Sequence, residues 1–197
     1  IDDTFNIKKF AIKSNLNFDN LNINYRSNFI KKYLTSFDNK ITIKNPQILF
    51  EYSNDLIDFQ LDGKYLLQNK EDNFFIKYKG SENNYELYTL LNLDDSDLKI
   101  GEIQYLKKKN IPSKLEILLN KSIIGFNLQK ISFKENKNYI SIDNLYISDD
   151  FKLQSVDKID ANFFNIKGVK NNFQIKKNSN NYQFIGNQID GEKIIEK

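Results

Sequence analysis

The side chains that most often carry catalysis or bind metals are scarce in this chain of 197 residues. It contains no His and no Cys, which removes the commonest general base, the commonest zinc ligands and a thiolate nucleophile. The densest carboxylate group is Asp94, Asp95 and Asp97, and a second pair is Asp149-Asp150. A calcium loop needs acidic residues at a fixed spacing around a Gly, with a later Glu. Neither group has that order, so we predict a turn at each.

Other signatures of enzymes are also missing from the sequence. It has no Gly-rich phosphate loop and no G-x-S-x-G motif for a nucleophilic serine. Two carboxylates brought together by the fold could serve a carbohydrate-active enzyme, but no spacing selects such a pair. We therefore expect no enzymatic activity, no cofactor and no metal.

The positive charge is spread along the chain. The net charge is +3, and Lys107-Lys108-Lys109 is the only tight basic run. We interpret this run as a solvated loop that leads to Pro112, because a nucleic-acid site would gather its Lys and Arg on one face. We expect no nucleic-acid partner.

Alternation of apolar and polar residues dominates the sequence and predicts β-strands. From Lys40 onward, apolar residues recur at every second position in one segment after another, and short polar breaks separate the segments. Breaks of this length suit an antiparallel meander and are too short for crossover helices. The clearest case is the segment 172–197, where 173–175 and 182–184 form the arms of a hairpin and Asp190 can cap a short C-terminal helix.

One segment has helical spacing instead. Residues 28–37 place their apolar side chains at the positions of one helix face, and Ser27 precedes them as a candidate N-cap. We predict a short amphipathic helix that covers one open end of the sheet. A helix lying on a membrane surface is the alternative, which the short length and small basic surplus disfavour.

The sequence thus predicts an all-β protein: an elongated, curled antiparallel sheet, groove-like or sandwich, with a short helix near 28–37 and another at the C-terminus. We expect one β-rich segment over 1–197, with a soft boundary near 110–113, where Pro112 interrupts the pattern. Because the chain has no Met, we expect a processed product or a part of a longer protein. Alternation is the same whether the apolar face packs against a second sheet or lines a groove, and we favour the closed core.

The C-terminal third resembles one known family. Its segments there read LQKISFKE at 128–135, IDNLYIS at 142–148, FKLQS at 151–155 and YQFIG at 182–186, followed by Asp190-Gly191, and LDGKY at 61–65 is similar to a phrase of the same proteins. These phrases are similar to the closing part of the AsmA-like bacterial envelope proteins.

The resemblance implies a function without catalytic residues. It implies a periplasmic protein, anchored to the inner membrane by a segment not present here, whose apolar sheet conducts phospholipid toward the outer membrane. The positions expected to contact lipid are the alternating apolar residues Ile57, Phe59, Leu61, Phe74, Ile76, Tyr78, Leu87, Ile117, Phe126, Ile131, Phe133, Phe173 and Phe184. The alternative is a structural or adhesive β-module with a fully packed core and no lipid ligand.

Overall fold

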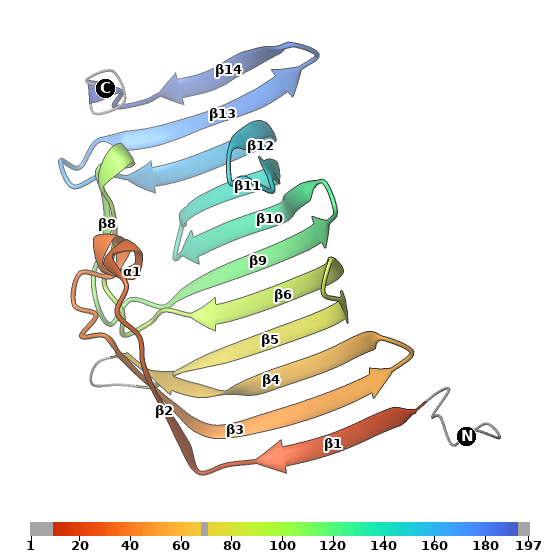
Figure 1. The fold of residues 1–197 in the computed structure, drawn as a ribbon. Helices are drawn as coiled ribbons and strands as arrows, with labels where there is room; N and C mark the ends of the chain where they lie inside the picture. Colours follow the sequence, from red (N-terminus) through yellow and green to blue (C-terminus); the bar gives the residue numbers. More distant parts are fainter. Residues whose placement is uncertain (1–9, 68–70, 193–197) are drawn as a thin grey trace.

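The computed structural model describes residues 10–67 and 71–192, and its main feature is one large antiparallel sheet (Figure 1). Eleven of its 12 strands form one path, and β2 (Asn20–Asn24) pairs with the first part of β3 beside it. In spatial order the path is β1 (Ala11–Asn17), β3 (Lys40–Ser53), β4 (Leu56–Leu66), β5 (Glu71–Ser81), β6 (Asn84–Asn92), β9 (Ser113–Ser122), β10 (Gly125–Glu135), β11 (Asn138–Ser148), β12 (Leu153–Phe164), β13 (Lys170–Asn178) and β14 (Asn181–Gln188).

Tight turns join most neighbouring strands, and polar residues make several of them. The β3–β4 turn is Asn54-Asp55, whose φ angles of 50° and 63° lie in the left-handed region that Asn and Asp tolerate. Residues 82–83 and 179–180 turn the chain between β5 and β6 and between β13 and β14. The hairpin predicted within 172–197 is confirmed as β13–β14.

The sheet is open, which confirms the all-β antiparallel fold and corrects one expectation. Strands follow one another without crossing, from β1 at one edge to β14 at the other (Figure 1). A barrel would require these two edges to pair, with the tilt and stagger that closure demands. No second large sheet packs against this one within the described residues, so the closed core that we favoured is wrong.

The segment between β6 and β9 folds back over one end of the sheet. It contains β7 (Leu98–Ile100), the 3-10 helix η1 (Gly101–Ile103) and β8 (Tyr105–Lys107), and β7 and β8 form a two-stranded sheet of their own. β6 pairs directly with β9, so the large sheet continues past this insertion. The boundary expected near 110–113 falls between β8 and β9.

The predicted N-terminal helix is present but shorter than the pattern suggested. α1 spans Asn28–Tyr33, and the Ser27 hydroxyl accepts a hydrogen bond from the backbone N–H of Ile30 at 3.1 Å, as an N-cap does. At Leu34 the backbone leaves helical geometry, and Phe37 is buried by the fold instead. The predicted C-terminal helix falls mainly on residues 193–197, outside the described residues.

α1 and residues 93–107 together form a cap over one end of the sheet. α1 lies against β7, Lys32 of α1 forms an ion pair with Glu102 at 2.5 Å, and the amide of Ile166 donates to the carbonyl of Gln104 at 2.8 Å. The last bond ties the cap to the turn between β12 and β13. The cap is therefore fastened to the sheet at widely separated strands.

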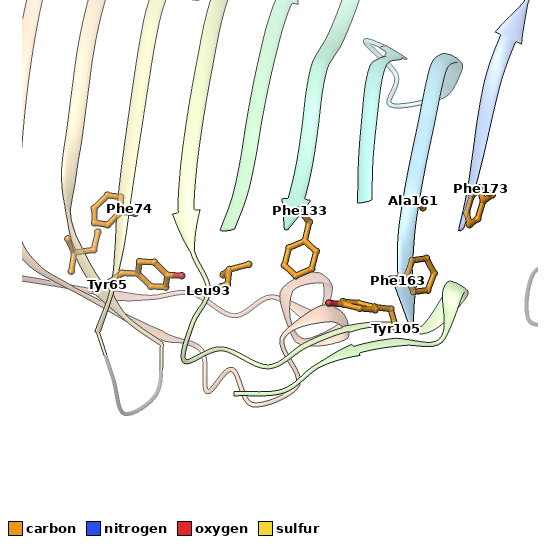
Figure 2. Packing of buried hydrophobic residues seen from close by; sticks show 9 residues of the cluster. Tyr65, Phe74, Leu93, Tyr105, Phe133, Ala161, Phe163 and Phe173 are labelled. Atoms are coloured by element: carbon orange, nitrogen blue, oxygen red, sulfur yellow. The ribbon is translucent and has the colours of Figure 1, made fainter. Parts of the chain in front are cut away.

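The buried core lies between this cap and the ends of the strands (Figure 2). The ring of Tyr105 from β8 meets Phe133 and Phe163 edge to face, with centroid distances of 5.8 and 5.5 Å. Its hydroxyl donates to the carboxylate of Glu135. The core consists of Ile43, Tyr65, Phe74, Leu93, Tyr105, Phe133, Ala161, Phe163 and Phe173.

Lys107 contradicts the prediction of a solvated basic loop. Its side chain is fully buried, while Lys108 and Lys109 are exposed. The Lys107 ammonium donates to the backbone carbonyls of Ser96 at 2.6 Å, Asp94 at 3.1 Å and Lys108 at 3.1 Å. The cap turns back at this point, and its own carbonyl groups supply the polar partners that the buried charge needs.

Candidate functional site

All thirteen apolar positions selected from the sequence lie on one face of the sheet. Directly paired residues of neighbouring strands point to the same side of a sheet, so the register defines rows across this face. The longest row crosses all eleven strands of the path, and ten of its members are apolar, Thr89 being the exception. It runs through Leu16, Ile48, Leu61, Ile76, Thr89, Ile117, Ile131, Ile142, Ile159, Ile175 and Phe184.

Two further rows lie beside this one, nearer to the end of the strands that the cap leaves uncovered. The first contains Phe50, Phe59, Tyr78, Leu87, Leu119, Leu128, Leu145 and Val156. The second contains Tyr52, Ile57, Gly80, Tyr85, Lys121, Phe126, Ile147 and Leu153. We call the three rows together the apolar strip.

The opposite face has a different character. Its rows carry many charged side chains, and cross-strand ion pairs join Lys130 to Glu116 at 2.8 Å and Lys44 to Glu71 at 2.7 Å. Gln60 and Lys77 are directly paired there. The alternation along each strand therefore separates one polar face from one apolar face.

The cap divides the thirteen positions into two groups. Five belong to the buried core or pack against it: Leu61, Phe74, Ile76, Phe133 and Phe173. The other eight lie outside that cluster: Ile57, Phe59, Tyr78, Leu87, Ile117, Phe126, Ile131 and Phe184. In the described part of the chain no second layer covers these eight: Phe184 is exposed and the other seven are half-buried by their neighbours, so solvent reaches part of each side chain.

Lys121 is the one charged residue in the three rows. Its ammonium lies 2.5 Å from the carboxylate of Asp149 and 4.8 Å from the centre of the Phe126 ring. The carboxylate compensates the charge, and the ring accepts the cation against its negative face. The strip is therefore electrically neutral, with its compensated cation at the margin farthest from the cap.

The acidic residues of 94–97 have structural roles. The buried Asp72 carboxylate accepts the backbone N–H groups of Asp94 at 3.2 Å and Asp95 at 3.1 Å, and the Asp94 carboxylate accepts the N–H of Ser113 at 2.8 Å. Burial raises the pKa of Asp72, since it penalises the ionised form more than these bonds favour it. The chain bends at Asp94-Asp95, and the carboxylates of Asp72 and Asp94 hold this part of the cap to the sheet.

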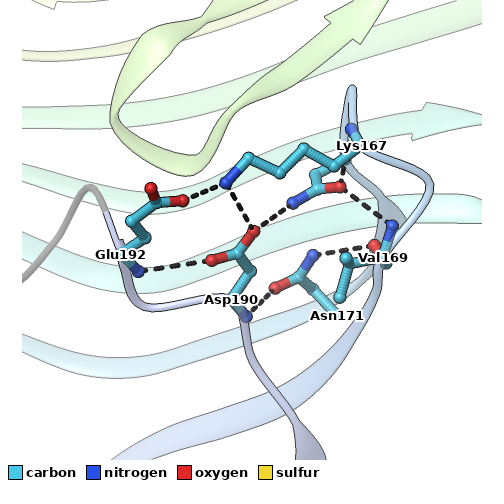
Figure 3. Close-up of polar contacts among 6 residues, drawn as sticks. Lys167, Val169, Asn171, Asp190 and Glu192 are labelled. Carbon is cyan, nitrogen blue, oxygen red and sulfur yellow. Dashed lines mark hydrogen bonds and ion pairs between the residues drawn. The ribbon is translucent and has the colours of Figure 1, made fainter.

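A second polar network fixes the chain after β14 (Figure 3). The N–H of Asp190 donates to Asn171 at 2.7 Å, the Asn165 amide donates to the Asp190 carboxylate at 2.7 Å, and Lys167 pairs with Glu192. The N–H of Glu192 donates back to the Asp190 carboxylate at 3.3 Å, the contact that an N-cap makes. All of these groups satisfy one another, so the network is structural.

Two further findings limit the chemistry of the described residues. Over 10–67 and 71–192, no three His, Cys, Asp or Glu side chains are grouped so as to hold a metal ion. No helix in the same ranges has the length and apolar character needed to cross a membrane.

Sequence reasoning missed two features around the strip. One is Lys107, because no local pattern distinguishes a buried lysine from its exposed neighbours. The other is the turn Ile123-Ile124 between β9 and β10, whose side chains are 79% and 82% exposed. The sequence does mark this turn as unusual, because two β-branched apolar residues occupy turn positions where Asn, Asp or Gly is usual.

Comparison with known proteins identifies no relative of this chain. No family model, no curated protein and no solved structure matches the chain. The apolar strip and its neutral character are therefore the features of the molecule that indicate a function.

Proposed function

We propose that this chain is a non-enzymatic phospholipid-transfer segment that shields acyl chains on its apolar strip. The observation that carries the proposal is the apolar strip: its longest row, from Leu16 to Phe184, is apolar at every strand except at Thr89, and its two outer rows lie outside the buried core and the residues packed against it. Monomeric soluble proteins rarely expose a continuous apolar surface of this extent unless something binds to it.

The dimensions and energetics suit an acyl chain. Eleven strands spaced about 4.8 Å apart give a strip about 48 Å long. Each methylene removed from water contributes about 0.8 kcal/mol, so a chain of about 15 methylenes gains about 12 kcal/mol before ordering costs. Because this attraction needs no specific hydrogen bond, it holds a lipid and still lets it slide along the strip.

The resemblance of the C-terminal third to AsmA-like envelope proteins supports the same proposal. On this proposal the chain works in a bacterial periplasm, as part of a protein anchored in the inner membrane, and its ligand is phospholipid with no role for nucleic acid. The cap closes one end of the apolar face, and acyl chains lie between the cap and the free hairpin turns.

Binding of a fluorescent phospholipid tests the proposal. The variant Phe59→Asp with Leu87→Asp places two charges in the same row, outside the core cluster, and we expect it to lose binding. The matched control is Gln60→Asp with Asn73→Asp, which makes the same change in net charge on the opposite face. Equal binding by the two variants, with both folded by circular dichroism, would contradict the proposal.

The structural or adhesive β-module is the competing proposal. It requires that protein covers the strip in the working state, so the chain would bind no phospholipid and would mask its apolar surface by association. Failure of the wild-type protein to bind the fluorescent lipid, together with concentration-dependent self-association that the Phe59→Asp, Leu87→Asp variant abolishes, would favour this module.

A further inference from the structure

Two neighbouring tips at the uncapped end of the sheet differ from the other turns there. The β9–β10 turn exposes Ile123 and Ile124 by 79% and 82%, the β11–β12 connection exposes Phe151 by 78%, and Leu153, the first residue of β12, is 65% exposed. The remaining turns at this end, at residues 54–55, 82–83 and 179–180, consist of polar residues. We call Ile123, Ile124, Phe151 and Leu153 the tip patch.

Contacts between the two tips make the patch one surface. The Phe151 ring stacks on Phe126 of β10, with centroids 5.5 Å apart and planes inclined by 23°. The ion pair of Lys121 with Asp149 at 2.5 Å joins the same connection to β9. Since Lys121, Phe126 and Leu153 belong to the outermost row of the apolar strip, the patch continues that strip to the edge of the molecule.

Backbone hydrogen bonds fix the loop that carries the exposed Phe151 side chain. The N–H of Phe151 donates to the carbonyl of Ser148 at 2.9 Å, and the N–H of Ser148 donates to the carbonyl of Lys152 at 3.0 Å. Phe151 has a φ of 59°, a conformation that costs free energy for a bulky aromatic residue and favours Gly or Asn. An ordered loop therefore keeps the Phe151 side chain exposed, although its backbone conformation is unfavourable for an aromatic residue.

The charges beside the patch are compensated within the protein. Lys121 pairs with Asp149, and Lys152 pairs with Asp150 at 2.6 Å. The patch therefore presents projecting apolar side chains with no excess of either sign. This combination suits insertion into the interface of a phospholipid bilayer, where apolar side chains are buried and attraction to anionic lipid is not required.

We propose that the tip patch docks the uncapped end of the sheet onto a phospholipid bilayer. This inference rests on the proposed function, because docking here brings the open margin of the apolar strip to the membrane from which an acyl chain would leave. An acyl chain would then meet apolar side chains along its whole path, from the bilayer past Phe126 to the inner rows of the strip.

Flotation with phosphatidylcholine vesicles tests the docking. We expect the wild-type protein to float with the vesicles equally at low and high salt, and Ile123→Ser with Ile124→Ser to lower the partition coefficient at least about tenfold. The control Glu82→Ser with Asn83→Ser changes a polar tip at the same end and should float like wild type. Absence of wild-type flotation, or equal flotation of both double variants, would overturn the inference.

A second readout locates the contact without relying on loss of binding. The chain contains no Trp, so Ile124→Trp and Asn83→Trp each introduce a single fluorophore at one tip. We expect vesicles to shift the emission of Ile124→Trp to shorter wavelength, brominated acyl chains to quench it, and Asn83→Trp to show neither effect. The same response from both would refute docking by the tip patch.

The docking and the lipid-binding proposals can fail separately. The strip variant Phe59→Asp with Leu87→Asp should keep its flotation while losing bound fluorescent lipid. A wild-type protein that binds the lipid but does not float would refute the docking and leave the proposed function standing. A protein that floats through Ile123 and Ile124 but binds no lipid would refute the proposed function and leave the docking standing.

Discussion

Replacing Lys107 tests whether a buried charge holds the beginning and the end of the cap segment 93–107 together. Lys107→Met keeps the length of the side chain but removes the ammonium, and so leaves the carbonyls of Ser96, Asp94 and Lys108 without their donor. A hydrogen bond to a charged group contributes about 1.5–3 kcal/mol, so the three bonds together contribute about 4.5–9 kcal/mol, and relief of the buried charge offsets roughly half of that loss. We expect a net destabilisation of about 2–5 kcal/mol.

Urea denaturation measures the global part of this effect. With a slope of about 2 kcal/mol per molar urea, a loss of about 3 kcal/mol lowers the midpoint by about 1.5 M. Hydrogen exchange measures the local part at the amide of Leu93, the first residue of the cap segment, which donates to the carbonyl of Ser113 on β9 at 3.0 Å. Lys108→Met changes an exposed neighbour and should alter neither quantity. A Lys107→Met protein with wild-type midpoint and wild-type protection at Leu93 would refute the assigned role.

Three further predictions follow from the buried residues. Phe133→Ala removes a side chain that is 4% exposed and should cost about 3–5 kcal/mol in urea denaturation, whereas Phe164→Ala, at 56% exposure, should cost less than about 1 kcal/mol. Gly125→Ala would place its Cβ 2.3 Å from a carbonyl oxygen of β11 and should cost about 1–3 kcal/mol, while Gly101→Ala meets nothing within 4 Å; similar midpoints for the two would contradict the packing. Because burial raises the pKa of Asp72 above 3.8, its contribution to stability should fall as pH rises from 3.8 through the folded-state pKa, and Asp72→Asn should remove that slope from the pH dependence of unfolding.

The sequence predicted the strands and their shared face because alternation is a local signal. Each apolar position in the longest row, such as Ile76 or Ile131, is set by the period of its own strand. The polar turns then fix the register that places these positions beside one another. The type of sheet and the composition of its apolar face could therefore be read without any long-range information.

The open state of the sheet and the position of the cap could not be read in the same way. Alternation is identical in an open sheet and in a sandwich, and the choice depends on whether distant edges meet. The burial of Lys107 and Tyr105 depends on residues 93–107 folding back over strands as far away as β12. No periodicity within that segment specifies the distant contact, which explains why the burial of Lys107 was missed.

Native mass spectrometry of the chain, expressed in a bacterial periplasm and purified without detergent, tests the central claim most directly. We predict that phospholipid copurifies with the wild-type protein and with the Gln60→Asp, Asn73→Asp control, and is absent from the Phe59→Asp, Leu87→Asp variant. A lipid-free, monodisperse wild-type protein would contradict the claim that the apolar strip shelters acyl chains.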